Sequence, residues 1–190
     1  MAKKKIITAR EYVPEQNFFG GFVYGGGTMA FTAGYWALGA LKPDVIAYLG
    51  CDMIYPLEKE IPSHFYGNGQ ADPLRSDITL QSLEAKSVRL MALAQIHNCL
   101  VVNLSKLPKS RLLFPRTSIT KLLKKIDQKK VLCSQDLKLD SKSVKRALDL
   151  EGELAYMVPS GKYWESSIEF DRSKLREIDS LWLKSASQLN

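Results

Sequence analysis

The segment Val45-Ile46-Ala47-Tyr48-Leu49-Gly50-Cys51-Asp52 decides the fold class. Its first five residues form a short, continuously apolar run, which is typical of a strand in a parallel sheet that is covered on both faces. The run ends at a glycine, and open α/β sheets bind their ligands beyond the carboxyl ends of such strands. We therefore expect a parallel sheet, with a ligand site at Gly50 to Tyr55.

A second apolar run, from Cys99 to Leu104, follows a segment in which apolar residues recur at helical spacing. The order strand, helix, strand predicts that Val45–Leu49 and Leu100–Leu104 are neighbouring parallel strands joined by a helix around residues 78–96. Antiparallel pairing of the two runs would contradict this prediction.

The residues before the first strand divide into two parts. Residues 12–27 hold five of the twelve glycines and are expected to form a loop or short strand and then a flexible turn. Thr28 to Leu41 is apolar or small almost throughout, which predicts a buried helix with Thr28 as its N-cap and Pro43 beyond its end.

These elements predict an α/β fold with a Rossmann-like three-layer core over residues 1–116. A basic, mainly helical extension over residues 117–190 would follow it. In the extension the sequence favours helices at Ser118–Ile126, Ser141–Glu153 and Ser173–Ser187. The length of 190 residues suits one compact domain with such an appended piece.

The composition is that of an ordinary globular protein, with 45% hydrophobic and 25% charged residues. No apolar run approaches the length of a transmembrane helix, and the basic start lacks the long apolar region of a secretory signal. We therefore expect a soluble, cytoplasmic chain. The three cysteines contain no C-x-x-C pair, so neither a disulfide framework nor a zinc knuckle is indicated, and we expect no metal and no cofactor.

The charge is uneven along the chain. Residues 1–105 carry nine basic and nine acidic residues, whereas residues 106–190 carry eighteen and eleven, so the excess of seven lies in the second part. Either this is a solvated surface or it binds an anionic partner, and the candidate residues are Lys121, Lys124, Lys125, Lys129 and Lys130. Aromatic side chains are scarce there, which argues against a stacking platform for single-stranded nucleic acid.

Two segments supply the candidate ligand-binding residues. Gly26, Gly27 and Thr28 form a turn at a helix start, where backbone N–H groups and the positive end of the helix favour an anion, although such a turn equally serves only to bring the chain into the core. Asp52, directly after the strand, would hold a ribose hydroxyl, or would simply cap the next turn. His64 is the candidate catalytic residue together with Asp52, because it lies in a long glycine-bearing loop.

A family resemblance arises from the order of several motifs: Gly26-Gly27-Thr28, a helix ending in Ala37-Leu38-Gly39, the strand with Gly50-Cys51-Asp52, Ser63-His64-Phe65-Tyr66-Gly67, and Val101-Val102-Asn103-Leu104-Ser105. Over residues 24–116 this series resembles the latter half of Campylobacter-type bacterial sialyltransferases and the related Rossmann-like family that includes a pterin pyrophosphokinase. The resemblance implies sugar transfer from a cytidine-monophosphate donor without an essential metal, with a loop histidine as base and tyrosines on the phosphate.

The sequence departs from that family at three places. Asn68 stands at the position of the family's catalytic histidine, and an asparagine cannot act as a general base near neutral pH. His64 matches an earlier histidine, and Tyr55 lies one place beyond the family's phosphate-binding tyrosine. The family's nucleotide-binding glycine loop belongs to a half that would precede residue 20.

Two functions follow from these observations. The first is the handling of a nucleotide or nucleotide-sugar by a divergent or truncated glycosyltransferase-like protein. Its catalytic residues would be His64 and Asp52, and its ligand-binding residues Gly26, Gly27, Thr28, Tyr55, Tyr66, Asn68 and Arg75. The alternative is a non-catalytic module whose basic extension docks an acidic partner, nucleic acid or a membrane surface. The sequence specifies neither the substrate nor the oligomeric state.

Overall fold

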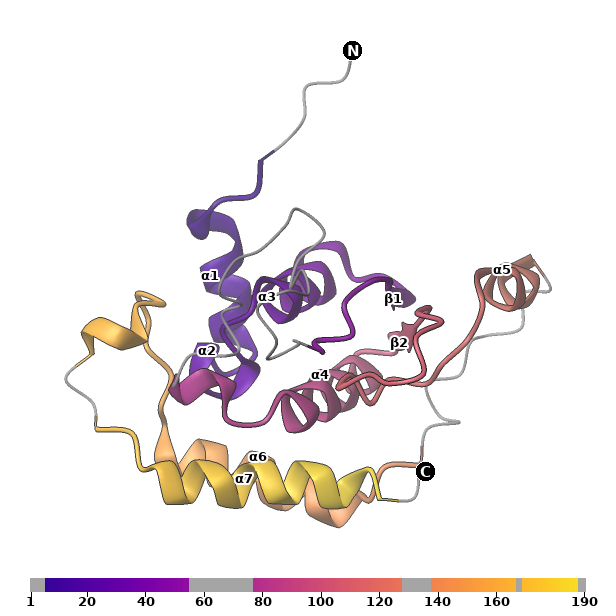
Figure 1. Ribbon diagram of the computed structural model, residues 1–190. Helices are drawn as coiled ribbons and strands as arrows, with labels where there is room; N and C mark the ends of the chain where they lie inside the picture. Colours follow the sequence, from indigo (N-terminus) through magenta and orange to yellow (C-terminus); the bar gives the residue numbers. More distant parts are fainter. Residues whose placement is uncertain (1–5, 55–76, 128–137, 167–168, 188–190) are drawn as a thin grey trace, which may run out of the picture.

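The computed structural model describes residues 6–54, 77–127, 138–166 and 169–187. Within these ranges the chain is mainly helical and holds a two-stranded parallel sheet (Figure 1). The elements are α1 (Ala9–Phe18), α2 (Phe22–Gly25), α3 (Met29–Trp36), η1 (Ala37–Leu41), β1 (Val45–Tyr48), η3 (Ile78–Leu80), α4 (Leu83–Ile96), β2 (Leu100–Asn103), α5 (Ile119–Asp127), α6 (Ser141–Leu154), η5 (Tyr163–Glu165) and α7 (Arg172–Ser185).

The sheet confirms the predicted strand pair. β1 and β2 run parallel, with Val45 opposite Leu100 and Tyr48 opposite Asn103, and α4 lies between them in the sequence. β2 is buried over residues 101–103, but in β1 Val45 and Ile46 are half-buried and Ala47 is exposed, so the expected cover on both faces is not seen for β1 among the described residues. The described residues show an α/β arrangement only in this small sheet, and a three-layer Rossmann-like core is not seen among them.

Most of residues 12–27 belong to α1 and α2, so the prediction of a loop or short strand is wrong there, and residues 19–21 and 26–27 are the non-helical positions. α1 begins because the Glu11 carboxylate accepts a hydrogen bond from the Thr8 backbone N–H at 2.9 Å, and it continues through Pro14. Gly20 and Gly21 then adopt positive φ angles of 93° and 88° between α1 and α2. The glycines therefore mark the ends of helices rather than a long loop.

The helix predicted from Thr28 is present, but it is only partly buried, because Met29 and Leu41 are 68% and 60% exposed. Thr28 is the N-cap of α3, and its side chain accepts a hydrogen bond from the Phe31 N–H at 3.3 Å. The last turns, Ala37–Leu41, are π-helical, and the chain leaves them at Lys42 with a φ of 48°. At Gly34 a side chain would collide with the Tyr48 hydroxyl, so this glycine allows the helix to lie close to β1.

The three helices predicted in the second part of the chain are also present. α6 and α7 lie side by side below α4 in Figure 1, and the Asp140 N–H, at the start of α6, donates to the Ser185 carbonyl at the end of α7. The two helices are therefore antiparallel. Leu175, Ile178 and Trp182 form the buried stripe of α7, as their helical spacing predicts.

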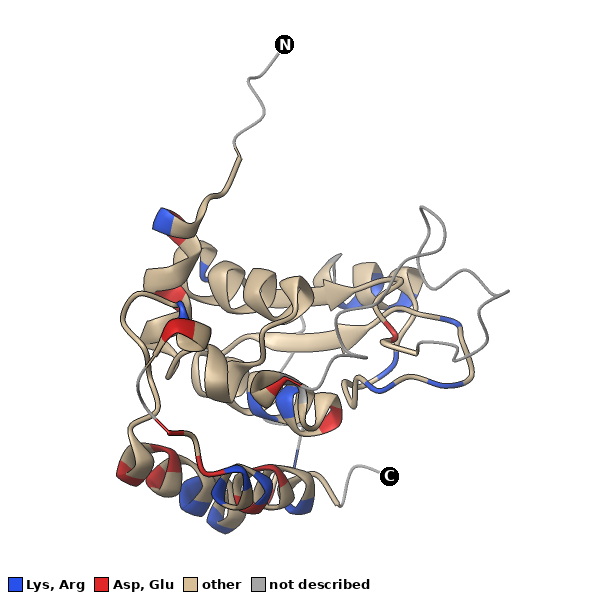
Figure 2. Ribbon diagram, turned by 60° about the vertical axis from the view of Figure 1, so that its left-hand side comes forward, with Lys and Arg blue, Asp and Glu red and all other residues tan. Residues whose placement is uncertain are grey.

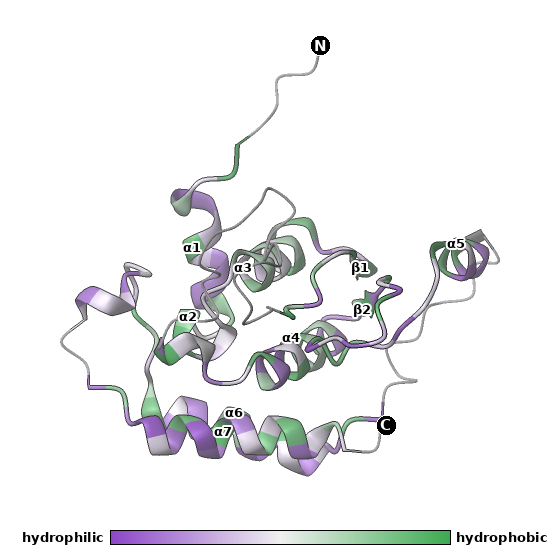
Figure 3. Ribbon diagram, in the orientation of Figure 1, coloured by the Kyte–Doolittle hydropathy of each residue, from purple (hydrophilic) through white to green (hydrophobic). Residues whose placement is uncertain are grey.

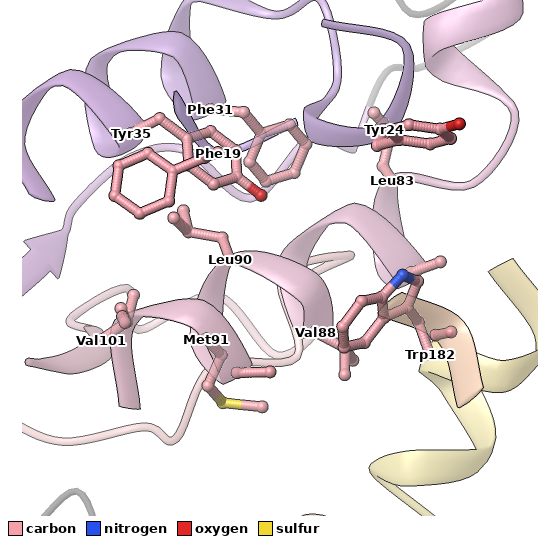
Figure 4. Packing of buried hydrophobic residues seen from close by; sticks show 14 of the residues in the cluster. Phe19, Tyr24, Phe31, Tyr35, Leu83, Val88, Leu90, Met91, Val101 and Trp182 are labelled. Carbon is pink, nitrogen blue, oxygen red and sulfur yellow. The ribbon is translucent and has the colours of Figure 1, made fainter. Parts of the chain in front are cut away.

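One buried cluster joins these helices to the sheet. In Figure 4 the aromatic rings of Phe19 and Phe31 face α4, and Trp182 of α7 reaches the same helix. Side chains from both sides of residue 116 belong to this cluster, while the predicted domain boundary at that residue stays a prediction. In the described ranges, none of the helices is both long and apolar enough to cross a membrane.

Two buried ion pairs connect α4 to the pair α6 and α7. Arg89 donates hydrogen bonds to the Glu151 carboxylate, the shortest at 2.7 Å, and Lys86 lies 3.1 Å from Asp179. The Trp182 indole N–H also donates to Glu151, at 3.0 Å. Burial of these charges is tolerated because each is paired with an opposite charge, and among the described residues the Asp179 carboxylate bonds through Oδ1 only.

Candidate functional site

The carboxyl ends of β1 and β2 lie at one edge of the sheet because the strands are parallel and in register. We call the segments that follow them, Leu49–Ile54 and Leu104–Arg116, the strand-end edge. The first turn of α4 is beside it, since Arg111 forms a two-pronged ion pair with Glu84 at 2.7 and 3.0 Å. Helix N-termini and strand carboxyl ends meet in this way where α/β proteins bind anionic ligands.

Asp52 is the central acidic residue of the strand-end edge. Only 5% of its surface is exposed. Ser105 donates its hydroxyl proton to Asp52 Oδ2 at 2.5 Å, and the Asn103 amide donates to Oδ1 at 3.4 Å. The Arg111 backbone N–H donates to the Asp52 carbonyl at 2.9 Å. The loop after β2 therefore fixes the residue that follows β1.

The Asp52 carboxylate has no cationic partner among the described residues. Its hydrogen bonds come from a hydroxyl and an amide, and none of the ion pairs includes it. A buried carboxylate without a counter-charge is costly, and a carboxylate accepts about four hydrogen bonds in all. Two hydrogen bonds to the Asp52 carboxylate come from described side chains, so its oxygens can accept further hydrogen bonds from the hydroxyl groups of a ligand.

The loop after β2 folds back onto the strand ends. Asn103 forms a parallel bridge with Arg116, and its side-chain amide donates to Ser110 Oγ at 3.1 Å. The Arg116 guanidinium donates to the carbonyl of Leu107. Lys106 and Lys109, on the same loop, are exposed. This part of the edge is positively charged, which suits a phosphate group.

Four of these residues, Asn103, Ser105, Ser110 and Arg111, were not among the residues predicted from the sequence to form the site. The sequence did contain one sign of their role, because the polar residues Asn103 and Ser105 stand at the end of the second apolar run. The carboxyl ends of neighbouring parallel strands lie at the same edge of a sheet, so this position places the two residues close to Asp52. The side-chain hydrogen bonds to Asp52, however, depend on the register of the two strands.

The glycine turn lies in other surroundings. Gly26 is buried with a φ of 91°, Gly27 is exposed, and Thr28 caps α3. A side chain at Gly27 would meet the Thr79 hydroxyl first and the Tyr163 hydroxyl next. No described contact connects this turn to Asp52, so the two parts of the predicted site are not brought into contact. Anion binding at the turn stays a prediction.

Five of the predicted site residues lie outside the described residues: Tyr55, His64, Tyr66, Asn68 and Arg75. Their proposed roles, including that of His64 as a catalytic residue, stay predictions. The same holds for Lys129 and Lys130 in the basic segment.

Two pKa shifts bear on the chemistry of the strand-end edge. Burial raises the pKa of the Cys51 thiol, and the neighbouring Asp52 charge raises it further. This thiol is therefore protonated at neutral pH and is a poor nucleophile. Burial alone would raise the pKa of Glu84, but the hydrogen bonds and charge of Arg111 lower it below its usual value.

A separate cleft of about 530 Å³ lies between α1, α4 and α6. Phe18 and His97 line it together with the paired Arg89 and Glu151. The backbone N–H of His97 caps the carboxyl end of α4, and the centroid of its ring lies 5.4 Å from that of the Phe19 ring. Because Arg89 and Glu151 bond to each other, this cleft offers a ligand little unsatisfied charge.

Comparisons of the chain with protein-family models, with curated proteins and with solved structures give no match.

Proposed function

We propose that the chain binds a nucleotide or nucleotide-sugar at the strand-end edge and is a glycosyltransferase-like protein. The observation that carries the proposal is the buried carboxylate of Asp52, which has no cationic partner among the described residues and lies beyond the carboxyl end of β1. In α/β proteins an acidic residue in such a position accepts hydrogen bonds from ribose hydroxyls.

The charges around Asp52 support the same class of ligand. Lys106, Lys109 and Arg116 belong to the loop that folds over the strand ends, and cations there suit the phosphate of a nucleotide. The amino terminus of α4 adds the positive end of a helix dipole. The resemblance to Rossmann-like sialyltransferases favours a cytidine nucleotide within this class.

A thermal-shift experiment tests the proposal with cytidine, uridine, adenosine and guanosine monophosphates. A ligand that binds only the native state stabilises it, by about 1.4 kcal/mol at ten times its dissociation constant. For a chain of this size we expect the melting temperature to rise by roughly 3–6 °C with at least one nucleotide.

The variant Asp52→Asn keeps the size of the side chain and should lose this shift. Asp149→Asn, which removes an exposed acidic group on α6, is the matched control and should keep it. Four nucleotides without effect on the wild type, or an equal shift in Asp52→Asn, would contradict the proposal.

A further inference from the structure

α5 has two chemically opposite faces. Ile119, Leu122, Leu123 and Ile126 are spaced so that they lie on one side of the helix. Lys121, Lys124 and Lys125 lie on the other side. Figure 3 shows hydrophobic and hydrophilic residues together on this helix. Such a helix normally buries its apolar side against a protein core or another apolar phase.

Most of the apolar side of α5 is exposed. The exposed fractions are 61% for Ile119, 52% for Leu123 and 50% for Ile126, whereas Leu122 is buried. Among the described elements none packs extensively against α5, and Figure 1 shows it standing away from α3, α4, α6 and α7. The described part of the protein therefore leaves most of this apolar side in water.

The surroundings of α5 are basic and partly apolar. Residues 104–126 contain seven Lys or Arg, four before residue 117 and three after it, and no Asp or Glu. Figure 2 shows basic residues on α5 and on the loop that leads to it. Leu107 on that loop and Leu49 and Ile54 on the neighbouring segment are also exposed. Positive charge and exposed aliphatic groups thus occur together at the strand-end edge.

We propose that α5 and the loop over residues 104–116 bind the surface of a bilayer that contains anionic lipid. A membrane interface binds exposed aliphatic groups and positive charges together, because the aliphatic side chains enter the boundary of the acyl chains while the lysines bind the anionic headgroups. The lysines next to the apolar side have long stems that reach outward to the headgroups. The proposal does not depend on nucleotide binding.

Nucleic acid fits these observations less well. It would use the positive charge, but contacts to phosphates give no reason for three exposed aliphatic side chains on one side of a helix. Single-stranded nucleic acid also favours aromatic platforms, and Phe114, the single aromatic residue of this segment, is buried. Nucleic acid therefore enters the test as a competing outcome.

Vesicle flotation provides the test, with the full chain and two kinds of vesicle. One kind is phosphatidylcholine alone, and the other contains about one third phosphatidylglycerol. We expect binding to the anionic vesicles that weakens between about 0.1 M and about 0.5 M salt, because the charges are screened. Binding to pure phosphatidylcholine should be much weaker, because α5 is a short helix with a small apolar side.

Two variants separate the contributions of charge and apolar surface. The charge variant is Lys121→Gln, Lys124→Gln and Lys125→Gln. Each lysine near an anionic surface raises the affinity roughly five-fold, so the loss of three should weaken vesicle binding about a hundred-fold. The apolar variant is Ile119→Gln, Leu123→Gln and Ile126→Gln, which keeps helix propensity and should lose at least ten-fold. The control replaces three exposed lysines elsewhere, Lys42, Lys142 and Lys184, by Gln and should change affinity by less than about five-fold.

Each outcome decides the proposal. Loss in both the charge and the apolar variant, with the control variant close to wild type and circular dichroism unchanged, supports it. Wild-type protein that fails to float with anionic vesicles overturns it. An apolar variant that binds like wild type also overturns it, as does tighter binding to a DNA or RNA duplex than to the vesicles, because the surface would then be a general polyanion site.

Discussion

Ser105 donates a hydrogen bond of 2.5 Å to the carboxylate of Asp52, although the two residues follow different strands and lie 53 positions apart in the sequence. This contact exists because β1 and β2 are parallel and end at one edge. It connects the segment after each strand and holds a buried negative charge in place. Contacts within the protein itself therefore hold Asp52 in place at the strand-end edge.

Replacing Ser105 by Ala tests this connection. The change leaves a buried carboxylate with one donor fewer, so the free energy of unfolding should fall by roughly 1.5–3 kcal/mol, the range for a hydrogen bond to a charged group. Urea denaturation measures the effect. Ser180→Ala is the control, because that exposed hydroxyl donates only to a carbonyl of its own helix, and its effect should stay within about 0.5 kcal/mol. Equal effects of the two variants would show that the Ser105 contact is weak.

The buried ion pair between Arg89 and Glu151 predicts that removing one partner destabilises the protein much more than removing both. Arg89→Met leaves the buried Glu151 carboxylate without its cation and should cost about 3–5 kcal/mol of stability. Adding Glu151→Leu removes the unpaired charge and should recover a large part of the loss. A double-mutant cycle from urea denaturation gives the coupling energy. Additive effects would mean that the two groups act independently.

The ion pair between Glu84 and Arg111 predicts a pH dependence. Because the pKa of Glu84 is lower in the folded chain than its usual value of 4.5, the unfolded chain binds more protons in that range. The pair therefore contributes its full stability above about pH 4.5, and the contribution is lost as the pH falls through the lower, folded-state pKa.

Arg111→Gln should reduce this acid sensitivity, measured as the free energy of unfolding between about pH 6 and about pH 3. Lys109→Gln, which removes an exposed charge from the same loop, serves as the control and should retain the wild-type slope. If both variants kept that slope, the titration would have to belong to other groups.

Two glycines in helices should respond in opposite directions to alanine. Gly34 faces the Tyr48 hydroxyl and Leu90 so closely that a methyl group forces α3 away from β1, and overpacking of this kind typically costs about 1–3 kcal/mol. Gly152 in α6 has open space around it, so Gly152→Ala should stabilise the protein by about 0.5–1 kcal/mol. Melting temperatures of the two variants check the contrast, and destabilisation by Gly152→Ala would contradict it.

The sequence was most informative where one local pattern determines the structure. The continuously apolar run at Val45 predicted a parallel strand, although β1 is only partly buried, and Thr28 predicted the start of α3 because an N-cap acts within one turn. The sequence does not predict α1 and α2, because the five glycines of residues 12–27 favour a loop. The interaction between Thr8 and Glu11, which starts α1, lies outside the glycine-rich segment.

Long-range contacts could not be predicted in the same way. Arg89 and Glu151 are charged residues in segments predicted to be amphipathic, where charges usually face water. Long-range packing buries them, because α7 lies against both α4 and α6 and because Phe19 and Tyr35 also contact Arg89. Similarly, the position of Asp52 after a strand was evident, whereas its hydrogen bond from Ser105 depends on the register of two strands.

Nucleotide binding at the strand-end edge is tested most directly by the backbone amide spectrum of nitrogen-15-labelled protein during titration with cytidine monophosphate. The account predicts saturable shifts at Asp52, Asn103, Ser105 and Arg116, with little change along α6 and α7. It also predicts that Asp52→Asn removes these shifts while the rest of the spectrum stays folded. Saturable shifts confined to the cleft around Asn17 and His97, or no shifts at millimolar nucleotide, would contradict it.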